Sequence, residues 1–269
     1  MRTPSSHGLD LHDIARSVRL LDHARRRLCL GSAGLLGLAA CTTAPLRGPE
    51  RPAGGIVPFS ATRSLGALPD GWAEQVMRRD LPRTAYTMVE RDGRRVLQAV
   101  SDGGASGLRC DVDIDPQATP WLEWAWRAER VEPGATVAAN ETDDAPARLM
   151  LAFDGDVSRL TLRDQMFQEM VQAVTGYAVP FATLIYVWDG QAPPESVFRN
   201  PRTDRARYLV VQSGSAGAGR WLGYRRNVVE DYRRVFGEEP GRIQSVGVMT
   251  DSDDLGTHAE AWYADISLR

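Results

Sequence analysis

The sequence of 269 residues has no lysine, only four histidines and only three cysteines. Beyond residue 40 a single histidine, His258, is left, so a histidine zinc site or a Ser-His-Asp triad would depend on that one side chain. The Gly/Ser-rich segment 213–219 lacks the lysine and the spacing of a phosphate-binding loop. Catalysis is therefore a minor hypothesis, with a carboxylate pair such as Glu123 and Asp144 as a candidate for glycoside hydrolysis.

The N-terminal apolar run, residues 28–40, is too short to span a bilayer. It follows Arg25-Arg-Arg27 and ends in small residues, which is the layout of a signal peptide. Its end, Leu38-Ala-Ala-Cys41, resembles the bacterial lipobox, and this resemblance implies that Cys41 carries a lipid. Ordinary secretory cleavage and an uncleaved anchor stay open as alternatives, and Arg25-Arg26 also resembles a twin-arginine export signal.

The rest of the chain is acidic. Residues 1–40 hold six of the 32 arginines and three of the 35 acidic residues, so the remainder carries 26 against 32, a formal charge of −6. This balance argues against a nucleic-acid partner.

Residues 41–55 are rich in Pro, Gly, Thr and Ala, a composition that predicts a flexible tether. If Cys41 carries a lipid, Cys110 is the only free cysteine of the mature chain, so no internal disulfide can form. Its alternation with Leu108 and Val112 predicts a buried, inert thiol.

The segment Trp121-Leu-Glu-Trp-Ala-Trp-Arg127 supplies more aromatic area than any other. Side chains alternate along a strand, so Trp124 and Trp126 should point to one face and Trp121 and Arg127 to the other. We therefore expect the core to form around this strand. Further strands are expected at 86–90, 95–100, 107–114, 147–153, 181–188, 206–212, 220–226, 243–250 and 259–268, with the last two forming a hairpin.

Two segments have a helical period instead. One face of 162–175 carries apolar residues and is expected to cover the strand 181–188, with Gly176 as the C-terminal cap (Met166, Phe167, Met170, Val171 and Val174). A second helix is expected at 228–236, between the N-cap Asn227 and Gly237. Short connections and the absence of βαβ alternation predict a mainly β fold, an antiparallel β-sandwich of the jelly-roll kind with two short helical insertions. We expect one such domain over 56–269.

A set of motifs resembles a known bacterial family, domain of unknown function 3047. The similar segments are Val57-Pro-Phe-Ser60, Leu122-Glu-Trp-Ala-Trp-Arg127, Asp143-Asp-Ala-Pro-Ala-Arg148, residues 180–188, residues 225–232 and Met249-Thr-Asp-Ser-Asp253. The resemblance covers essentially 56–268 and implies a single domain without an assigned activity. The last strands also resemble, more weakly, those of galactose-binding-like jelly rolls.

Two acidic loops are candidates for a site. Asp251, Asp253 and Asp254 offer hard oxygen ligands for Ca²⁺, although a solvated turn explains the same composition. Asp143 and Asp144 lie between strands that carry Arg127 and Arg148. If those strands pair, the arginines can latch the aspartates in bidentate contacts.

The functional alternative to the latch is a sugar cleft. In that reading Arg127, Asp143, Asp144 and Arg148 line the cleft, with Trp121 or Trp188 stacked on the sugar's apolar face. Tryptophans buried in the core explain the same residues. We therefore expect a lipid-anchored protein of the bacterial cell envelope that faces the periplasm or the exterior, has no required cofactor and binds a glycan. Docking to an envelope protein and glycoside processing are the alternatives.

Overall fold

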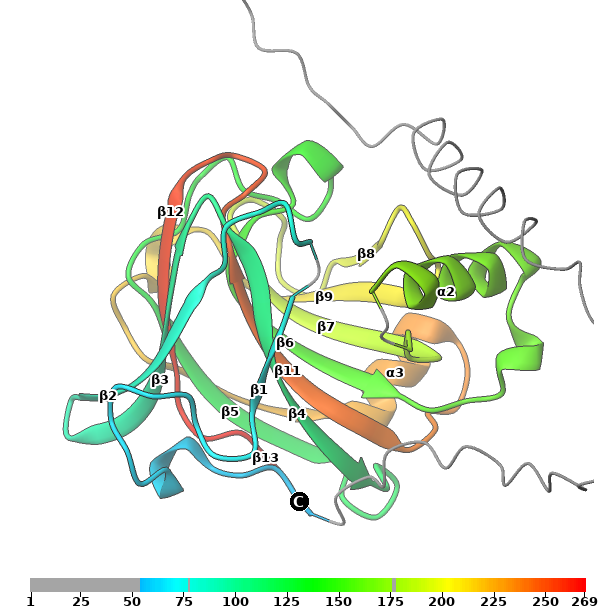
Figure 1. Ribbon diagram of the computed structural model, residues 1–269, viewed down its shortest axis with the longest axis horizontal. Coiled ribbons are helices and arrows are strands. Elements are labelled where there is room, and N and C mark those ends of the chain that lie inside the picture. Colours follow the sequence, from blue (N-terminus) through cyan, green and yellow to red (C-terminus); the bar gives the residue numbers. More distant parts are fainter. Residues whose placement is uncertain (1–53, 77, 176–177) are drawn as a thin grey trace, which may run out of the picture. The chain divides into compact units, whose positions relative to one another are not determined.

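The computed structural model describes residues 54–76, 78–175 and 178–269 (Figure 1). The expected leader, Cys41, nearly all of the tether and the expected cap Gly176 lie outside these residues, and the division of the chain into leader, tether and domain stays a prediction. Within the described part, no helix combines the length and the apolar character needed to cross a membrane.

Two β-sheets form the body of the structure. One has seven strands in the order β1-β4-β11-β6-β7-β9-β8, and the other has the order β10-β5-β12-β3-β2, with β13 also paired to β5. The fold class is as predicted, mainly β with a jelly-roll-like sandwich of two sheets. The strands are β1 Ala73–Gln75, β2 Ala85–Arg91, β3 Arg94–Asp102, β4 Ala105–Ile114, β5 Trp121–Ala128, β6 Ala145–Phe153, β7 Ala182–Asp189, β8 Val197–Arg199, β9 Ala206–Ser213, β10 Leu222–Asn227, β11 Ile243–Asp251, β12 His258–Tyr263 and β13 Ser267–Leu268.

Two helices accompany the sheets, α2 at Leu162–Thr175 and α3 at Val228–Phe236. The ends of α3 are as predicted, because the Asn227 side chain accepts from the backbone N–H groups of Val229 and Glu230, and Gly237 adopts the left-handed conformation. Short 3₁₀ turns lie at Phe59–Ala61, Asn140–Thr142, Val157–Arg159 and Ser215–Gly217.

The core forms around β5, as expected. Trp124 and Trp126 point between the sheets, and Trp126 is fully buried. Trp124 packs on Tyr224 with ring centroids 4.9 Å apart, and Trp126 packs on Trp188 at 6.5 Å. Trp121 and Arg127 lie on the opposite, outer face of β5 and are only partly buried. Cys110 is buried, as predicted, and burial raises the pKa of its thiol.

Several expected pairings are wrong. β11 belongs to the seven-stranded sheet and β12 to the six-stranded one, so the last two long strands do not form a hairpin. β5 and β6 are divided between the sheets in the same way. Among the early connections only β2 to β3 is a hairpin, built on Asp92 and Gly93 with positive φ. The length of a connection distinguishes a short link between strands from a helical crossover. It does not distinguish a hairpin within one sheet from a turn that leads into the facing sheet.

The apolar face of α2 is also not where we expected it. Leu162 is 73% exposed and Met166 61%, whereas Asp164 is buried and its carboxylate accepts from the hydroxyls of Thr161 and Thr203. The second face of β7 instead contributes Ile185 and Val187 to a smaller apolar cluster, which contains no α2 residue among the side chains that the structure describes (Ala105, Val137, Ala145, Met150, Ile185, Val187, Ala192, Tyr208, Val210 and Met249). The buried carboxylate of Asp164 therefore anchors the helix, and of the predicted stripe Phe167 and Val171 are half-buried whereas Met166 and Met170 are exposed.

Candidate functional site

The structure does not unite the six predicted ligand-binding residues in one cleft. Asp143, Asp144 and Arg148 lie together at the start of β6. Trp121 and Arg127 lie on the outer face of the six-stranded sheet. Trp188 is fully buried, and its indole N–H donates to the carbonyl of Gly214 at 3.0 Å, so it cannot stack on a ligand from solution. The candidate residues therefore fall into two separate regions of the structure.

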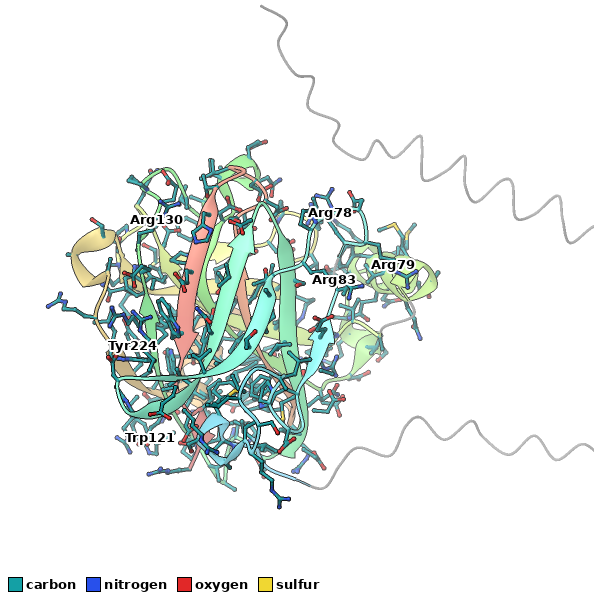
Figure 2. The ribbon with its side chains drawn as sticks, turned by 60° about the vertical axis from the view of Figure 1, so that its left-hand side comes forward. Arg78, Arg79, Arg83, Trp121, Arg130 and Tyr224 are labelled. Atoms are coloured by element: carbon teal, nitrogen blue, oxygen red, sulfur yellow. The ribbon has the colours of Figure 1, made fainter. Side chains whose placement is uncertain are left out.

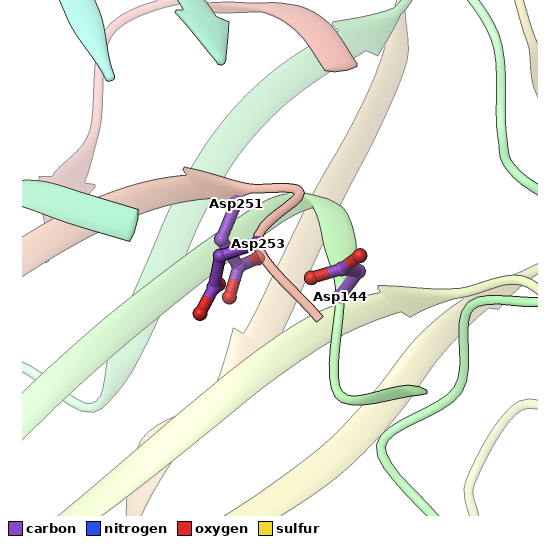
Figure 3. A group of neighbouring side chains, drawn as sticks. All are labelled: Asp144, Asp251 and Asp253. Atoms are coloured by element: carbon purple, nitrogen blue, oxygen red, sulfur yellow. The ribbon is translucent and has the colours of Figure 1, made fainter. Parts of the chain in front are cut away.

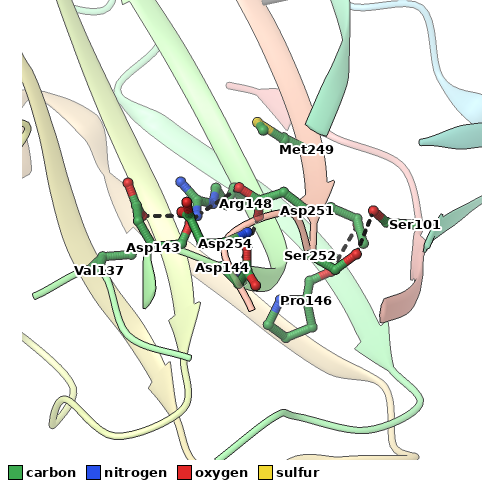
Figure 4. Close-up of polar contacts among 12 residues, drawn as sticks. Ser101, Val137, Asp143, Asp144, Pro146, Arg148, Met249, Asp251, Ser252 and Asp254 are labelled. Carbon is green, nitrogen blue, oxygen red and sulfur yellow. Dashed lines mark hydrogen bonds and ion pairs between the residues drawn. The ribbon is translucent and has the colours of Figure 1, made fainter. Parts of the chain in front are cut away.

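The first region is an ion-pair cluster centred on Arg148 (Figure 4). Antiparallel pairing of β6 with β11 places Asp251 beside Ala145, so the start of one strand meets the end of the other. The guanidinium of Arg148, 4% exposed, lies 3.0 Å from a carboxylate oxygen of Asp143 and 2.9 Å from one of Asp251. Tyr208 donates its hydroxyl to Asp143 at 2.9 Å. Burial raises the pKa of Asp251, against the opposing pull of Arg148.

Asp144 has a different role from the predicted one. Its carboxylate accepts from the backbone N–H of Asp254 at 3.0 Å and of Leu255 at 2.9 Å, and so holds the loop that follows β11. The expected latch thus exists, but it joins Arg148 to Asp143 and Asp251. Arg127 takes no part in this latch, because it lies on the outer face of the six-stranded sheet. There its guanidinium is 3.6 Å from the carboxylates of both Asp92 and Glu129.

Three carboxylates of this region lie close enough to share a cation (Figure 3). Oxygens of Asp144, Asp251 and Asp253 all lie within 4.8 Å of one another, so Asp144 takes the place predicted for Asp254. Ca²⁺ requires six to eight oxygen ligands. Both oxygens of Asp144 already accept backbone N–H groups, and Asp251 is bound by Arg148 and by the N–H of Ala145. The calcium site stays a prediction, which melting curves with and without CaCl₂ would test.

The second region is a groove of about 750 Å³ on the six-stranded sheet. It extends over β5 and β10 to the β2–β3 hairpin and to the chain around β13. β10 pairs with β5 so that Gly223 lies opposite Ala125 and Arg225 opposite Glu123, all pointing outward. The lining residues are Ser60, Gly93, Arg94, Arg95, Val96, Glu123, Trp124, Ala125, Gly223, Tyr224, Arg225, Ala264, Asp265, Ser267 and Arg269.

Small residues form the floor of the groove and charged ones form its edges. No atom lies within 4 Å of the position that a Cβ would take at Gly223, so the space above this residue is open. Glu123 is held between two arginines, 3.2 Å from Arg225 and 3.5 Å from Arg269. Asp265 accepts from the backbone N–H and the hydroxyl of Ser60 at 2.8 and 2.6 Å. The groove walls are therefore fixed by contacts within the chain.

Arginines lie over tryptophans around this groove. The guanidinium of Arg225 is 3.7 Å from the ring centroid of Trp121, which Figure 2 shows with Tyr224 at one side of the molecule. Arg94 lies 4.8 Å from the ring centroid of Trp221. The indole N–H of Trp221 donates to Asp92 at 2.9 Å, so the hairpin tip is fixed against the start of β10. Such cation–π contacts orient the guanidinium groups without consuming their in-plane donors.

The sequence matches the family described as "Protein of unknown function (DUF3047)" over residues 70–267. The chain belongs to this family. No curated protein matches it. Similar solved structures include the family 11 carbohydrate-binding module of cellulase Lic26A-Cel5E of Clostridium thermocellum, with 10% identity, TM-score 0.39 and coverage of 80% of this chain and 94% of the other.

Two further solved structures to which this DUF3047 protein is similar are enzymes. The xyloglucanase domain of NopAA from Sinorhizobium fredii, solved with cellobiose, has 11% identity, a TM-score of 0.40 and coverage of 74% and 92%. Endoglucanase 3 of Trichoderma harzianum, from family GH12, has 7% identity, a TM-score of 0.41 and coverage of 76% and 94%.

Sequence reasoning missed most of the groove of this DUF3047 protein. Alternation along β5 did place Trp121, Glu123 and Arg127 on one face. Gly223 carried no signal, and Arg225 stood out only as the start of the family-like segment 225–232. Neither was a site candidate, because their importance comes from pairing β10 with β5 across about a hundred residues of chain. The suggested pair of Glu123 and Asp144 does not share a cleft, since Glu123 lies on the outer face of the six-stranded sheet and Asp144 lies just before β6 of the seven-stranded sheet.

Proposed function

We propose that the protein is a non-catalytic binding protein of the bacterial cell envelope whose groove on the six-stranded sheet holds a glycan. The groove carries this proposal: it is open, and it combines a floor of small residues with charged hydrogen-bonding groups at its edges. Its volume lies within the range of small-molecule sites, about 300–1,000 Å³. A sugar ring presents apolar C–H faces and hydroxyl edges, and this floor and these edges can match both.

The contacts of the groove's carboxylates support binding over hydrolysis. A glycosidase needs a pair of carboxyl groups that can reach the scissile bond. Glu123 lies between two guanidinium groups, and Asp265 accepts two hydrogen bonds from Ser60. Both carboxylates of the groove are therefore engaged by groups of the chain itself. His258, the last candidate for acid–base work, pairs with Asp102 at the surface.

The envelope location is part of the proposal and depends on the lipobox-like Leu38-Ala-Ala-Cys41. In this reading a lipid on Cys41 anchors the protein to a membrane, and the tether lets the groove face the periplasm or the cell exterior. An open groove on a membrane-anchored protein is better suited to holding a polymer in place than to carrying a small metabolite.

A groove-filling variant tests the proposal. Gly223→Trp places a large ring in open space without a clash in the core, so it should abolish binding to any glycan that the full chain selects on a glycan array, with an unchanged melting temperature. Gly223→Ala adds one methyl group and should keep most of the affinity. Binding that survives Gly223→Trp would place the ligand elsewhere, and release of reducing ends from a bound glycan would favour a glycosidase.

A second candidate function is docking to an envelope protein through α2. The observation that favours it is the exposed apolar stripe of Leu162, Met166 and Met170 on this helix. Cross-linking in cells should then yield an adduct that is lost on Met166→Glu. Persistence of the adduct in this variant would exclude α2 as the contact.

A further inference from the structure

We infer that the ligand of the groove is an acidic glycan, a polysaccharide that carries carboxylates such as those of uronic acid residues. This inference rests on the proposed function and specifies its ligand class. It comes from the charge of the groove and from the way in which the groove's own charges are paired.

The groove is positive on an acidic protein. Four arginine side chains and two carboxylates line it, an excess of two positive charges, whereas the whole chain has a formal charge of −3. The arginines come from both sides: Arg94 and Arg95 from the β2–β3 hairpin, Arg225 from β10 and Arg269 from the segment after β13. A polymer lying across β5 and β10 would meet guanidinium groups on either side.

The two carboxylates do not neutralise all of this charge. Glu123 is shared by Arg225 and Arg269, and Asp265 is occupied by Ser60. Arg95 donates to the backbone carbonyl of Thr62 at 2.7 Å and forms no ion pair in the part of the chain that the structure describes. Within the described residues, Arg94 has its contact with Trp221 and no ion pair. Arg94 and Arg95 therefore offer two positive charges to a ligand.

The chemistry of these groups favours carboxylates. A guanidinium presents N–H donors in a planar fork that matches the two oxygens of a carboxylate. Stacking on Trp221 holds the plane of Arg94 and lowers the entropy lost when the ligand binds. Carboxylates at regular intervals along a uronic acid polymer can engage both sides of the groove at once.

Nucleic acid is the competing polyanion, and the state of the aromatic side chains argues against it. Single-stranded nucleic acid gains affinity by stacking bases on open aromatic faces. Here Arg225 lies over Trp121, and Trp262 is 2% exposed beneath Arg91 and Arg127. Neither tryptophan therefore offers an open face to a base.

The test compares glycans that differ only in charge. Polygalacturonate, alginate and hyaluronan are each titrated into the full chain beside the fully methyl-esterified form of the same polymer. We expect at least one acid form to bind about tenfold or more tightly than its ester, as the loss of a charge-assisted hydrogen bond implies. Arg94→Gln should weaken binding of that acid form about tenfold and leave the ester nearly unaffected.

Arg79→Gln is the matched control, because it removes the same charge from an exposed residue across the molecule from Trp121 and Tyr224 (Figure 2) and should change nothing. Equal affinity for acid and ester, or binding of neutral glycans alone, would overturn the inference and leave the proposed function standing. Binding of no glycan, neutral or acidic, would overturn both. Tighter binding of single-stranded DNA than of any acidic glycan would assign the groove to nucleic acid.

Discussion

Replacing Arg148 by methionine should destabilise the protein far more than an equivalent surface change. Methionine keeps most of the aliphatic packing of the side chain but removes the guanidinium that lies 2.9 Å from Asp251. Asp251 is 4% exposed and would be left buried without its cation. Removing one partner of a buried ion pair costs roughly 3–5 kcal/mol in unfolding free energy. The cost is large because Asp251 cannot regain water without opening the β6–β11 pairing.

The matched control lies on β4, which pairs with β11, the strand of Asp251. Arg109 and Asp111 form an ion pair at 2.6 Å, a shorter distance than in the buried pair, but their side chains are 28% and 53% exposed. An exposed pair contributes about 0–1 kcal/mol, because water replaces the lost partner. Arg109→Met should therefore cost little although its ion pair is the closer one. Burial, not distance, decides which arginine matters.

Thermal unfolding followed by circular dichroism measures the difference. In a folded unit of about 150–250 residues, 1 kcal/mol shifts the melting temperature by roughly 2–4 °C. We expect Arg148→Met to lower it by about 6–20 °C and Arg109→Met by no more than about 4 °C. The double variant Arg148→Met, Asp251→Asn should recover part of the loss, since no buried charge is then left unpaired. Equal small losses for both single variants would refute the reasoning.

Three further predictions concern the acidic loop and the N-terminus. Partial desolvation and the neighbouring carboxylates of Asp253 and Asp144 raise the pKa of Asp254 to about 6, above its unfolded value. This group therefore lowers stability as pH rises through about 4 to 6, and Asp254→Asn should raise the melting temperature at pH 7 and change it little at pH 4. Asp144→Ala should cost about 1–3 kcal/mol through two lost hydrogen bonds to the loop backbone, and an unchanged urea midpoint would contradict this. Cys41→Ser should abolish lipidation, which mass spectrometry of the membrane fraction would show; a lipidated variant would disprove the assignment.

What could be predicted from the sequence is what depends on neighbouring residues. The alternation of 121–128 gave the two faces of β5, and Asn227 and Gly237 gave the ends of α3, because a strand face and a helix cap are both set within a few residues. The acidic loops at 143–144 and 251–254 were also recognised, but as two separate candidates. Arg148 was expected to hold Asp143 and Asp144 because it lies in the same motif, and its contact with Asp251 was not foreseen.

What could not be predicted depends on contacts across the chain. The separation of β11 from β12 into different sheets has no local signal, since the same short acidic turn serves a hairpin or a corner. The apolar residues of α2 were expected to cover β7, and this prediction was wrong. Two threonine hydroxyls anchor Asp164 instead, and Met166 is exposed. The groove requires β10 to lie beside β5, so none of its outward glycine and arginine positions stood out.

The position of Arg269 has a practical consequence for anyone who handles this protein. Its backbone N–H and C=O both bond to Trp121 at 2.9 Å, and its side chain lines the groove. A purification tag or reporter fused after Arg269 would begin at the edge of the groove and compete with whatever enters it. A fluorescent label attached there would instead change its emission when a ligand occupies the groove. The attachment point that interferes with a binding assay is therefore suited to a fluorescent sensor.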